Sequence, residues 1–175
     1  MTILAVDVDY RPDGAAIAAG VAFADWRSDR VETTVLRRID QVAPYRPGYF
    51  YQRELPCILA LLSDLPIEPQ TIVIDGHVWL GASRQAGLGA HLHAALNGAI
   101  PVVGVAKTRF RDTPAETEVL RGHSARPLYV TAAGVDEALA RMAVRSMAGS
   151  GRMPTMLSAV DRACRSAFRE RLHTP

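Results

Sequence analysis

Two short, uninterrupted apolar segments constrain the fold of this chain more than any other feature. Residues 71–74 read Thr-Ile-Val-Ile and residues 102–105 read Val-Val-Gly-Val. Strands that are apolar at nearly every position are typical of parallel sheets covered by helices on both faces. Helical patterns over residues 84–97 and 135–148 accompany these strands. In the second, the apolar residues that follow helical spacing are Val135, Ala138, Leu139, Met142, Ala143 and Met147. The chain is therefore predicted to be an α/β protein.

The N-terminal part shows a different pattern, that of an antiparallel meander. Residues 2–10, 15–25 and 31–38 are predicted strands, and the turn at residues 11–14 joins the first two. A strand at 128–131 and helices at 57–65 and 155–172 complete the pattern. We expect a mixed sheet, with the meander first and βα units after it. At 175 residues and 49% hydrophobic content, the chain is expected to form one domain over residues 1–175.

Four carboxylates interrupt the apolar patterns. Asp7 lies inside the first strand, Asp75 ends the strand at 71–74, Glu54 lies at the entrance of the helix at 57–65, and Asp161 shares the apolar face of the last helix. Each of them alone is most simply a cap or an ion pair. Together they predict a common site, because buried carboxylates are costly unless a cation compensates them. Oxygen ligands of this kind suit Mg²⁺.

Two further charged residues belong to this interpretation. Lys107 is the only lysine among 20 basic residues, and a compact ammonium differs from a planar guanidinium at a crowded phosphate site. It is a candidate for facing the charge that builds on a phosphate, although a single lysine also arises by chance. Asp9 is either a fifth acidic member or a partner of Arg11.

The loop that precedes Glu54 is framed by prolines. Pro44 and Pro47 fix φ and hold Tyr45 and Arg46 extended, so an aromatic ring can be presented to a partner without first being ordered. Gly48 then permits close backbone approach. The alternative is a loop whose tyrosines pack against the edge of the domain.

Composition limits the partners and the compartment. The net charge is only +2, so a nucleic acid would be held by a local basic patch. Cys57 and Cys164 lie among apolar residues, as reduced core thiols do, which predicts a cytoplasmic protein. The N-terminal residues resemble neither a signal peptide nor a membrane span, so no membrane partner is expected.

Several separated motifs then resemble the endonuclease V family, whose members are ribonuclease H-like nucleases. The matching segments, in chain order, are 5–8 (Ala-Val-Asp-Val), 44–48 (Pro-Tyr-Arg-Pro-Gly), 53–56 (Arg-Glu-Leu-Pro), 74–77 (Ile-Asp-Gly-His), 87–92 (Gly-Leu-Gly-Ala-His-Leu), 100–107 (Ile-Pro-Val-Val-Gly-Val-Ala-Lys) and 152–154 (Arg-Met-Pro), followed by Asp161. The resemblance extends over nearly the whole chain. It implies a ribonuclease H-like mixed sheet and an Mg²⁺-dependent endonuclease, for which Mn²⁺ can substitute.

The resemblance also implies roles for individual residues. Asp7, Asp75, Glu54 and Asp161 would hold the metal, with Lys107 beside the scissile phosphate. Tyr45 would be a wedge within the nucleic-acid-binding loop of Pro44, Arg46, Pro47 and Gly48, and Gly76 would bring its backbone near the base. His77 is expected to orient water or phosphate. The implied substrate is DNA or RNA that contains inosine, cut at the second phosphodiester bond on its 3′ side by a monomer.

The chain departs from the family pattern near the expected base pocket. Val78 replaces a glycine, Trp79 and Leu80 follow with one apparent insertion, and the segment at 108–128 is shorter than usual. Three functions therefore stay open: an active endonuclease, an inosine-binding protein that cuts poorly, and another ribonuclease H-like nuclease directed by nucleic-acid structure.

Overall fold

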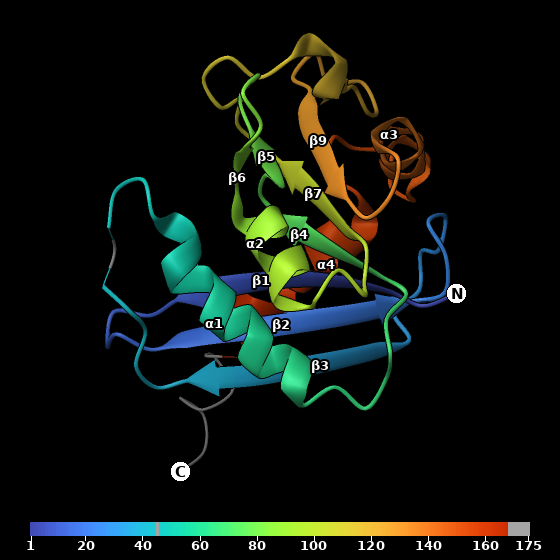
Figure 1. Ribbon diagram of the computed structural model, residues 1–175. Helices are drawn as coiled ribbons and strands as arrows, with labels where there is room; N and C mark the ends of the chain where they lie inside the picture. Colours follow the sequence, from blue (N-terminus) through green and yellow to red (C-terminus); the bar gives the residue numbers. More distant parts are fainter. Residues whose placement is uncertain (45, 168–175) are drawn as a thin grey trace.

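The computed structural model describes residues 1–44 and 46–167. In this part of the chain, seven strands form one mixed sheet in the order β3–β2–β1–β4–β7–β9–β8 (Figure 1). The strands of this sheet are β1 (Ile3–Tyr10), β2 (Ala16–Phe23), β3 (Thr33–Ile39), β4 (Thr71–Asp75), β7 (Val102–Ala106), β8 (Glu118–Val119) and β9 (Leu128–Ala133). The predicted mixed α/β sheet is confirmed.

The first three strands form the predicted antiparallel meander. β1 pairs with β2 along its whole length, and β2 pairs with β3. The turn between β1 and β2 contains Gly14 at φ +84°, a conformation that glycine adopts without steric cost. The Asp13 carboxylate closes this turn by accepting a hydrogen bond from the Ala15 amide at 3.1 Å.

The centre of the sheet is parallel. β4 pairs in parallel with β1 on one side and with β7 on the other. The carboxyl ends of these three strands therefore lie at the same edge, where open α/β sheets place their ligand sites. β9 runs antiparallel to β7, and the short strand β8, which sequence patterns did not predict, pairs antiparallel with β9.

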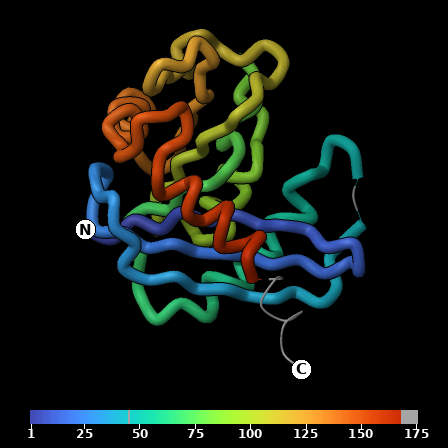
Figure 2. The backbone as a smooth tube through the Cα atoms, turned by 180° about the vertical axis from the view of Figure 1, so that it is seen from behind, coloured from blue at the N-terminus to red at the C-terminus, as the bar shows by residue number. Residues whose placement is uncertain are grey.

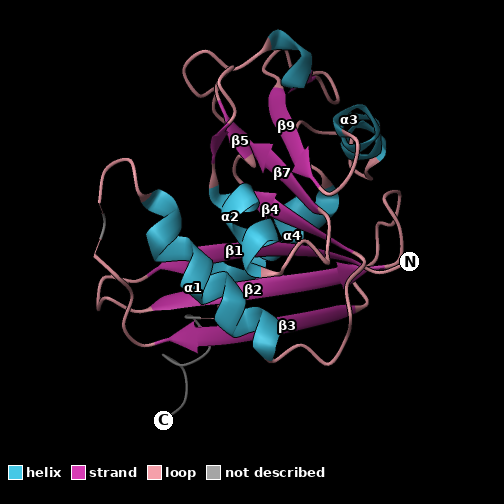
Figure 3. Cartoon of the chain, in the orientation of Figure 1, coloured by secondary structure: helices cyan, strands magenta, loops and turns pink. Residues whose placement is uncertain are grey.

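Helices cover both faces of the sheet (Figure 3). α1 (Phe50–Ser63) and α2 (Leu88–Ala95) pack on the face that carries Leu4, Ile72 and Ile74. α3 (Glu137–Ser146) and α4 (Thr155–Ser166) cover the opposite face (Figure 2). None of the helices in the described part of the chain has the length and apolar character needed to cross a bilayer.

The first helix begins seven residues earlier than predicted. Pro56 suggested a helix start, but it lies inside α1, which begins at Phe50. Contacts with distant parts of the chain favour the additional turns. Tyr51 stacks on His91 with ring centroids 3.7 Å apart, and the Arg53 guanidinium lies 3.8 Å from the centroid of the Tyr10 ring.

The second helix begins four residues later than predicted. Residues 79–86 instead contain a small hairpin of β5 (Trp79–Leu80) and β6 (Gln85–Ala86). Arg84, where the helix was expected to start, has φ +54° in the hairpin turn. The N-cap of α2 is Gly87, where a β-carbon would lie only 2.6 Å from the carbonyl oxygen of His77.

The two C-terminal helices match their predicted positions more closely. α3 buries Ala140 and Val144, and its C-cap residue Met147 is also buried. By contrast, Leu139 and Met142, which belong to the predicted apolar face, are 59% and 67% exposed. The predicted apolar face of α3 is thus only partly the core face. α4 ends at Ser166, and residues 168–172 of the predicted last helix lie outside the described residues.

Candidate active site

Asp7 and Asp75 lie next to each other at the carboxyl ends of two neighbouring parallel strands. Val6 pairs with Ile74, so the two aspartates occupy the next position in each strand. Because side chains alternate along a strand, both point to the face of Ala5 and Val73, which α3 and α4 cover. The parallel register alone therefore brings two carboxylates together.

Two helices supply the other predicted acidic residues. Glu54 comes from the second turn of α1 and not from its entrance, and Asp161 comes from α4. Asp161 lies at the border of the apolar face of α4, with its side chain 30% exposed and 3.0 Å from Arg165. All four acids line one cavity of about 390 Å³, which we call the acidic cavity. Its lining residues are Asp7, Val8, Asp9, Tyr10, Phe50, Glu54, Asp75, Lys107, Asp161 and Arg165.

The carboxylates of the acidic cavity oppose one another's ionisation. Burial, followed by repulsion from Asp7 and Asp75, raises the pKa of Glu54 to about 8. Burial and repulsion from Asp75 raise the pKa of Asp7 to about 6, although the Val8 amide donates a hydrogen bond to Asp7 at 2.9 Å. The cavity therefore lacks enough positive charge to hold all its acids ionised.

Lys107 is one of two cationic side chains that line this cavity, and Arg165 is the other. It follows the last residue of β7, and its Nζ lies 2.5 Å from Oδ2 of Asp75. Burial lowers the pKa of Lys107, but the hydrogen bond to Asp75 and the attraction of Asp7, Asp75 and Asp161 outweigh that effect and raise it. Lys107 is an ammonium ion at neutral pH.

The donor chemistry of the acidic cavity fits a hard divalent cation. Glu54 is only 5% exposed, and its Oε2 has no hydrogen-bond partner among the described residues. This buried carboxylate oxygen is therefore available to bind a cation. In the described part of the chain, no group of three or more His, Cys, Asp or Glu side chains is arranged as it stands to hold a metal. To hold an ion here, these carboxylates would have to turn toward it, and Asp75 also bonds to Lys107.

Two further residues of the first strand, Asp9 and Tyr10, also line this cavity. Asp9 forms an ion pair with Arg11 at 3.0 Å, which is the second of the two roles that its sequence position allowed. Tyr10 was not predicted. Its hydroxyl is buried without a hydrogen-bond partner among the described residues, and the Arg53 guanidinium lies over its ring. The only sequence signal for Tyr10 was its place at the end of the strand that carries Asp7.

The proline-framed loop leads to a second cavity, of about 370 Å³, which we call the apolar cavity. Pro44, Arg46 and Pro47 are exposed, Tyr45 lies outside the described residues, and Gly48 has φ +82°. The lining residues are Gly48, Phe50, Tyr51, Gly76, His77, Leu80, Ala86, Gly87, Leu88 and Phe110. Phe50 lines both cavities, so the two are neighbours.

His77 and Val78 behave differently beside the apolar cavity. His77 Nε2 lies 3.0 Å from the Thr108 carbonyl oxygen, and its Nδ1 is buried without a partner among the described residues. Burial lowers the pKa of His77, which favours the neutral imidazole. Val78 is fully buried and packs among core residues, so its bulk fills the core and not this cavity.

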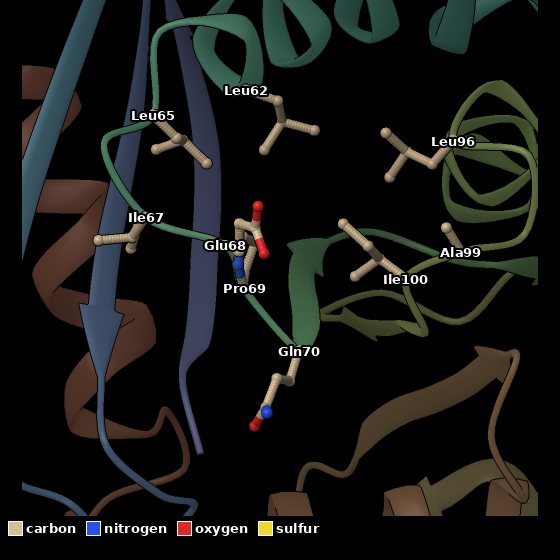
Figure 4. A pocket seen from close by; sticks show the side chains of 9 residues that line it. All are labelled: Leu62, Leu65, Ile67, Glu68, Pro69, Gln70, Leu96, Ala99 and Ile100. Atoms are coloured by element: carbon tan, nitrogen blue, oxygen red, sulfur yellow. The ribbon is translucent and has the colours of Figure 1, made fainter.

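A wider pocket of about 730 Å³ lies at the opposite end of β4 and β7 (Figure 4). Most of its lining residues are apolar, and Glu68 is the single charged side chain among them. Gln70 and Ile100 lie just before the amino ends of β4 and β7, whereas Asp75 and Lys107 lie at or beyond their carboxyl ends. Choosing a site by cavity volume alone would therefore favour this pocket over the acidic cavity, which holds the ionisable residues.

Comparison with known proteins supports the resemblance in the motifs. The family model for Endonuclease V matches residues 1–161. An Endonuclease V from Streptomyces coelicolor is 37% identical over 139 residues, which are 78% of this chain and 57% of that protein. The crystal structure of the Endonuclease V from Streptomyces avermitilis has a TM-score of 0.75 at 28% identity, covering 98% of this chain and 83% of that one.

A more distant solved structure shares the fold. The Endonuclease V of Ciona intestinalis, in complex with a 24mer DNA containing an inosine followed by a ribo-adenosine, gives a TM-score of 0.78 at 18% identity, covering 97% of this chain and 86% of that one. The chain spans little more than half the length of the first curated relatives it matches, 57% and 56%. The expected ribonuclease H-like fold class is confirmed. The match over residues 1–161 and the shared fold show that this chain belongs to the endonuclease V family.

Proposed function

We propose that the protein is a metal-dependent endonuclease that hydrolyses a phosphodiester bond in nucleic acid containing inosine. The observation that supports the proposal is the adjacency of two cavities that share Phe50 as a lining residue. One is lined by five carboxylates, the Lys107 ammonium and Arg165, and the other is mainly apolar. The first suits a phosphate and a cation, and the second suits a planar base.

In the acidic cavity, Asp7 and Asp75 would hold the cation, with Glu54 and Asp161 completing the acidic set. Mg²⁺ is the proposed ion, with Mn²⁺ able to replace it, because all four donors are hard oxygens. Such an ion, when bound, activates water and stabilises the charge on the departing oxygen. Lys107 would face the negative charge that develops on the phosphate, from a position already fixed by Asp75.

In the apolar cavity, an extruded hypoxanthine base would lie against Tyr51, Leu88 and Phe110. Gly48 and Gly76 would let the backbone approach the edge of the base, and His77 would help to orient the bound nucleotide or a water. Tyr45, with Pro44, Arg46 and Pro47, would fill the gap left in the stack. Aromatic stacking there would recover part of the few kcal/mol lost on unstacking.

The finer details of the reaction belong to the same proposal. The cut would fall at the second phosphodiester bond 3′ to the inosine and leave 3′-hydroxyl and 5′-phosphate ends. The protein would act as a single-domain monomer in the cytoplasm, in DNA repair or in the processing of inosine-containing RNA. Both substrates offer the same base and differ at the 2′-hydroxyl.

A cleavage assay tests the proposal. Oligonucleotides of DNA and RNA, with and without one inosine, are incubated with the protein and Mg²⁺ or EDTA. We expect cutting only with inosine and metal, and none by the Asp7→Asn variant. Asp64→Asn is the matched control, because Asp64 lies on the surface in an exposed ion pair with Arg37.

The same assay separates the alternatives. Tight binding of the inosine strand without cutting would indicate a binding protein. Cutting that depends on a branch or a strand end but not on inosine would indicate another ribonuclease H-like nuclease. Cutting by Asp7→Asn at the wild-type rate would place the active site elsewhere.

A further inference from the structure

A buried arginine lies among main-chain carbonyl groups, away from the acidic cavity. Arg121 is 5% exposed, and no carboxylate pairs with it among the described residues. Its guanidinium donates hydrogen bonds to the carbonyl oxygens of Arg145, Met147, Ala148, Gly149, Gly151 and Arg152. One side chain therefore holds most of the first six residues, 147–152, of the connection between α3 and α4.

Two features of the structure favour close contact between residues 121–122 and the connection between α3 and α4. The carbonyl groups at the C-terminus of α3 carry the negative end of the helix dipole, which favours a cation there. Gly122 has φ +57°, and a β-carbon on it would lie 2.1 Å from the Ser150 carbonyl oxygen. Only glycine fits at this contact.

The segment held by Arg121 continues into a second arginine, Arg152, which binds the main chain of Lys107. Arg152 donates to the carbonyl oxygen of Lys107 at 2.5 Å, to that of Pro127 at 2.7 Å and to that of Arg126 at 3.0 Å. These carbonyl groups lie just beyond the end of β7 and just before the start of β9. Arg152 thus joins two strands where their ladder has ended.

We infer that Arg121 and Arg152 are positioning residues that fix the main chain at Lys107 and so aim its ammonium group at Asp75. Arg121 holds the carbonyl of Arg152, the Arg152 guanidinium holds the carbonyl of Lys107, and the Lys107 side chain reaches Asp75. Neither arginine is among the residues that line the acidic cavity. The catalytic meaning of this chain of contacts rests on the proposed function, but the positioning itself does not.

The single lysine provides a direct readout of the positioning. In protein labelled with ¹³C and ¹⁵N only at lysine, every side-chain signal comes from Lys107. An ammonium held in one geometry gives two distinct ε-proton signals, and a freely rotating one gives signals that merge. We expect distinct signals in the wild type, measured at one fixed pH without metal or nucleic acid.

Arg152→Gln and Arg121→Gln are expected to merge these signals while the protein still melts cooperatively. Arg145→Gln is the matched control, because the Arg145 side chain is exposed and only its carbonyl oxygen joins the network. Should Arg121→Gln fail to fold, Arg152→Gln decides the question alone. A folded Arg152→Gln protein that keeps the wild-type lysine signals would overturn the inference.

Cleavage kinetics then connect the positioning to activity. We expect Arg152→Gln to lower kcat by roughly 10- to 100-fold with little change in KM, because a misplaced catalytic group costs rate more than binding. An unchanged kcat in a variant with merged lysine signals would refute the catalytic role of the positioning. A wild-type protein that cuts no substrate would refute the proposed function and leave the lysine measurement as a valid test of the contacts.

Discussion

The ammonium nitrogen of Lys107 lies 2.5 Å from Oδ2 of Asp75, which connects the residue after β7 to the last residue of β4. The contact is made at the edge of the sheet where three parallel strands end. It places the single lysine of the chain against a carboxylate that is a candidate metal ligand. Anything that binds at the acidic cavity meets both charges together.

The first prediction concerns the charge and shape of Lys107. Lys107→Gln should lower the rate of inosine-dependent cleavage by about 100- to 1000-fold, the usual loss when a group that stabilises transition-state charge is removed. Lys107→Arg should restore only part of the rate, because a planar fork does not replace a compact ammonium beside Asp75. Single-turnover cleavage measures both. Wild-type rates in Lys107→Gln would show that the lysine takes no part.

The second prediction is a pH dependence of stability in the metal-free protein. The pKa of Glu54 is raised from 4.5 to about 8 by burial and by repulsion from Asp7 and Asp75. Neutral Glu54 therefore favours the folded state fully below pH 4.5, and this contribution is lost as the pH rises through about 8. The loss should amount to a few kcal/mol at most.

Thermal melts in EDTA at pH 5.5 and pH 8.5 measure this effect. The wild type should lose more stability between the two values than Glu54→Gln, which has no ionisable group at that position. Adding Mg²⁺ should raise the melting temperature of the wild type at pH 8.5 and so reduce its loss of stability, because a cation compensates the ionised carboxylate. Equal losses in wild type and Glu54→Gln would contradict the proposed environment of Glu54.

The third prediction tests the apolar cavity as the base site. Ala86 lines this cavity, and an indole at that position should fill part of it. Ala86→Trp should raise the dissociation constant for inosine-containing strands at least about tenfold, without lowering the melting temperature or weakening metal binding. Ala82→Trp, on the same hairpin but outside the lining, is the control. Similar affinities for both variants would place the base elsewhere.

The fourth prediction concerns how the core accommodates Val78. A β-carbon on Gly89 would lie 2.5 Å from Cγ2 of Val78 and 3.0 Å from Cδ1 of Ile74. Gly89→Ala should therefore destabilise the protein by about 1–3 kcal/mol through overpacking, less about 1 kcal/mol gained from helix propensity.

A double-mutant cycle on denaturant unfolding checks this packing. Adding Val78→Ala to Gly89→Ala should cost less than the sum of the two single changes, because the shortened side chain frees the space. Gly151→Ala is the control, since a β-carbon there meets nothing within 4 Å. Strict additivity would mean that Val78 and Gly89 do not share this space.

Much of the fold and part of the site followed from local patterns. The continuous apolar strands identified β4 and β7, and their parallel pairing with β1 brought Asp7, Asp75 and Lys107 to one edge. The sequence could predict that these residues share a site, because side chains from several parallel strands converge at the carboxyl edge of the sheet.

The parts that sequence patterns missed depend on contacts between distant residues. Pro56 indicated a helix start, but the helix extends back to Phe50 because Tyr51 meets His91 and Arg53 meets Tyr10. The start of α2 was missed because Arg84 adopts a positive φ in a hairpin turn. Periodicity also could not show which of two apolar stripes of α3 faces the core, since both follow helical spacing.

Binding of Mn²⁺ to the acidic cavity is the measurement that tests the central claim most directly, because it needs neither substrate nor turnover. Electron paramagnetic resonance measures the concentration of free Mn²⁺ as protein is added, which gives the number of bound ions and their affinity. The proteins compared are the wild type, Asp7→Asn, Glu54→Gln and the surface control Asp64→Asn. We predict that the wild type and the control bind one or two ions and that Asp7→Asn and Glu54→Gln weaken binding by at least about tenfold. Wild-type affinity in both cavity variants would contradict a shared cation site formed by these carboxylates.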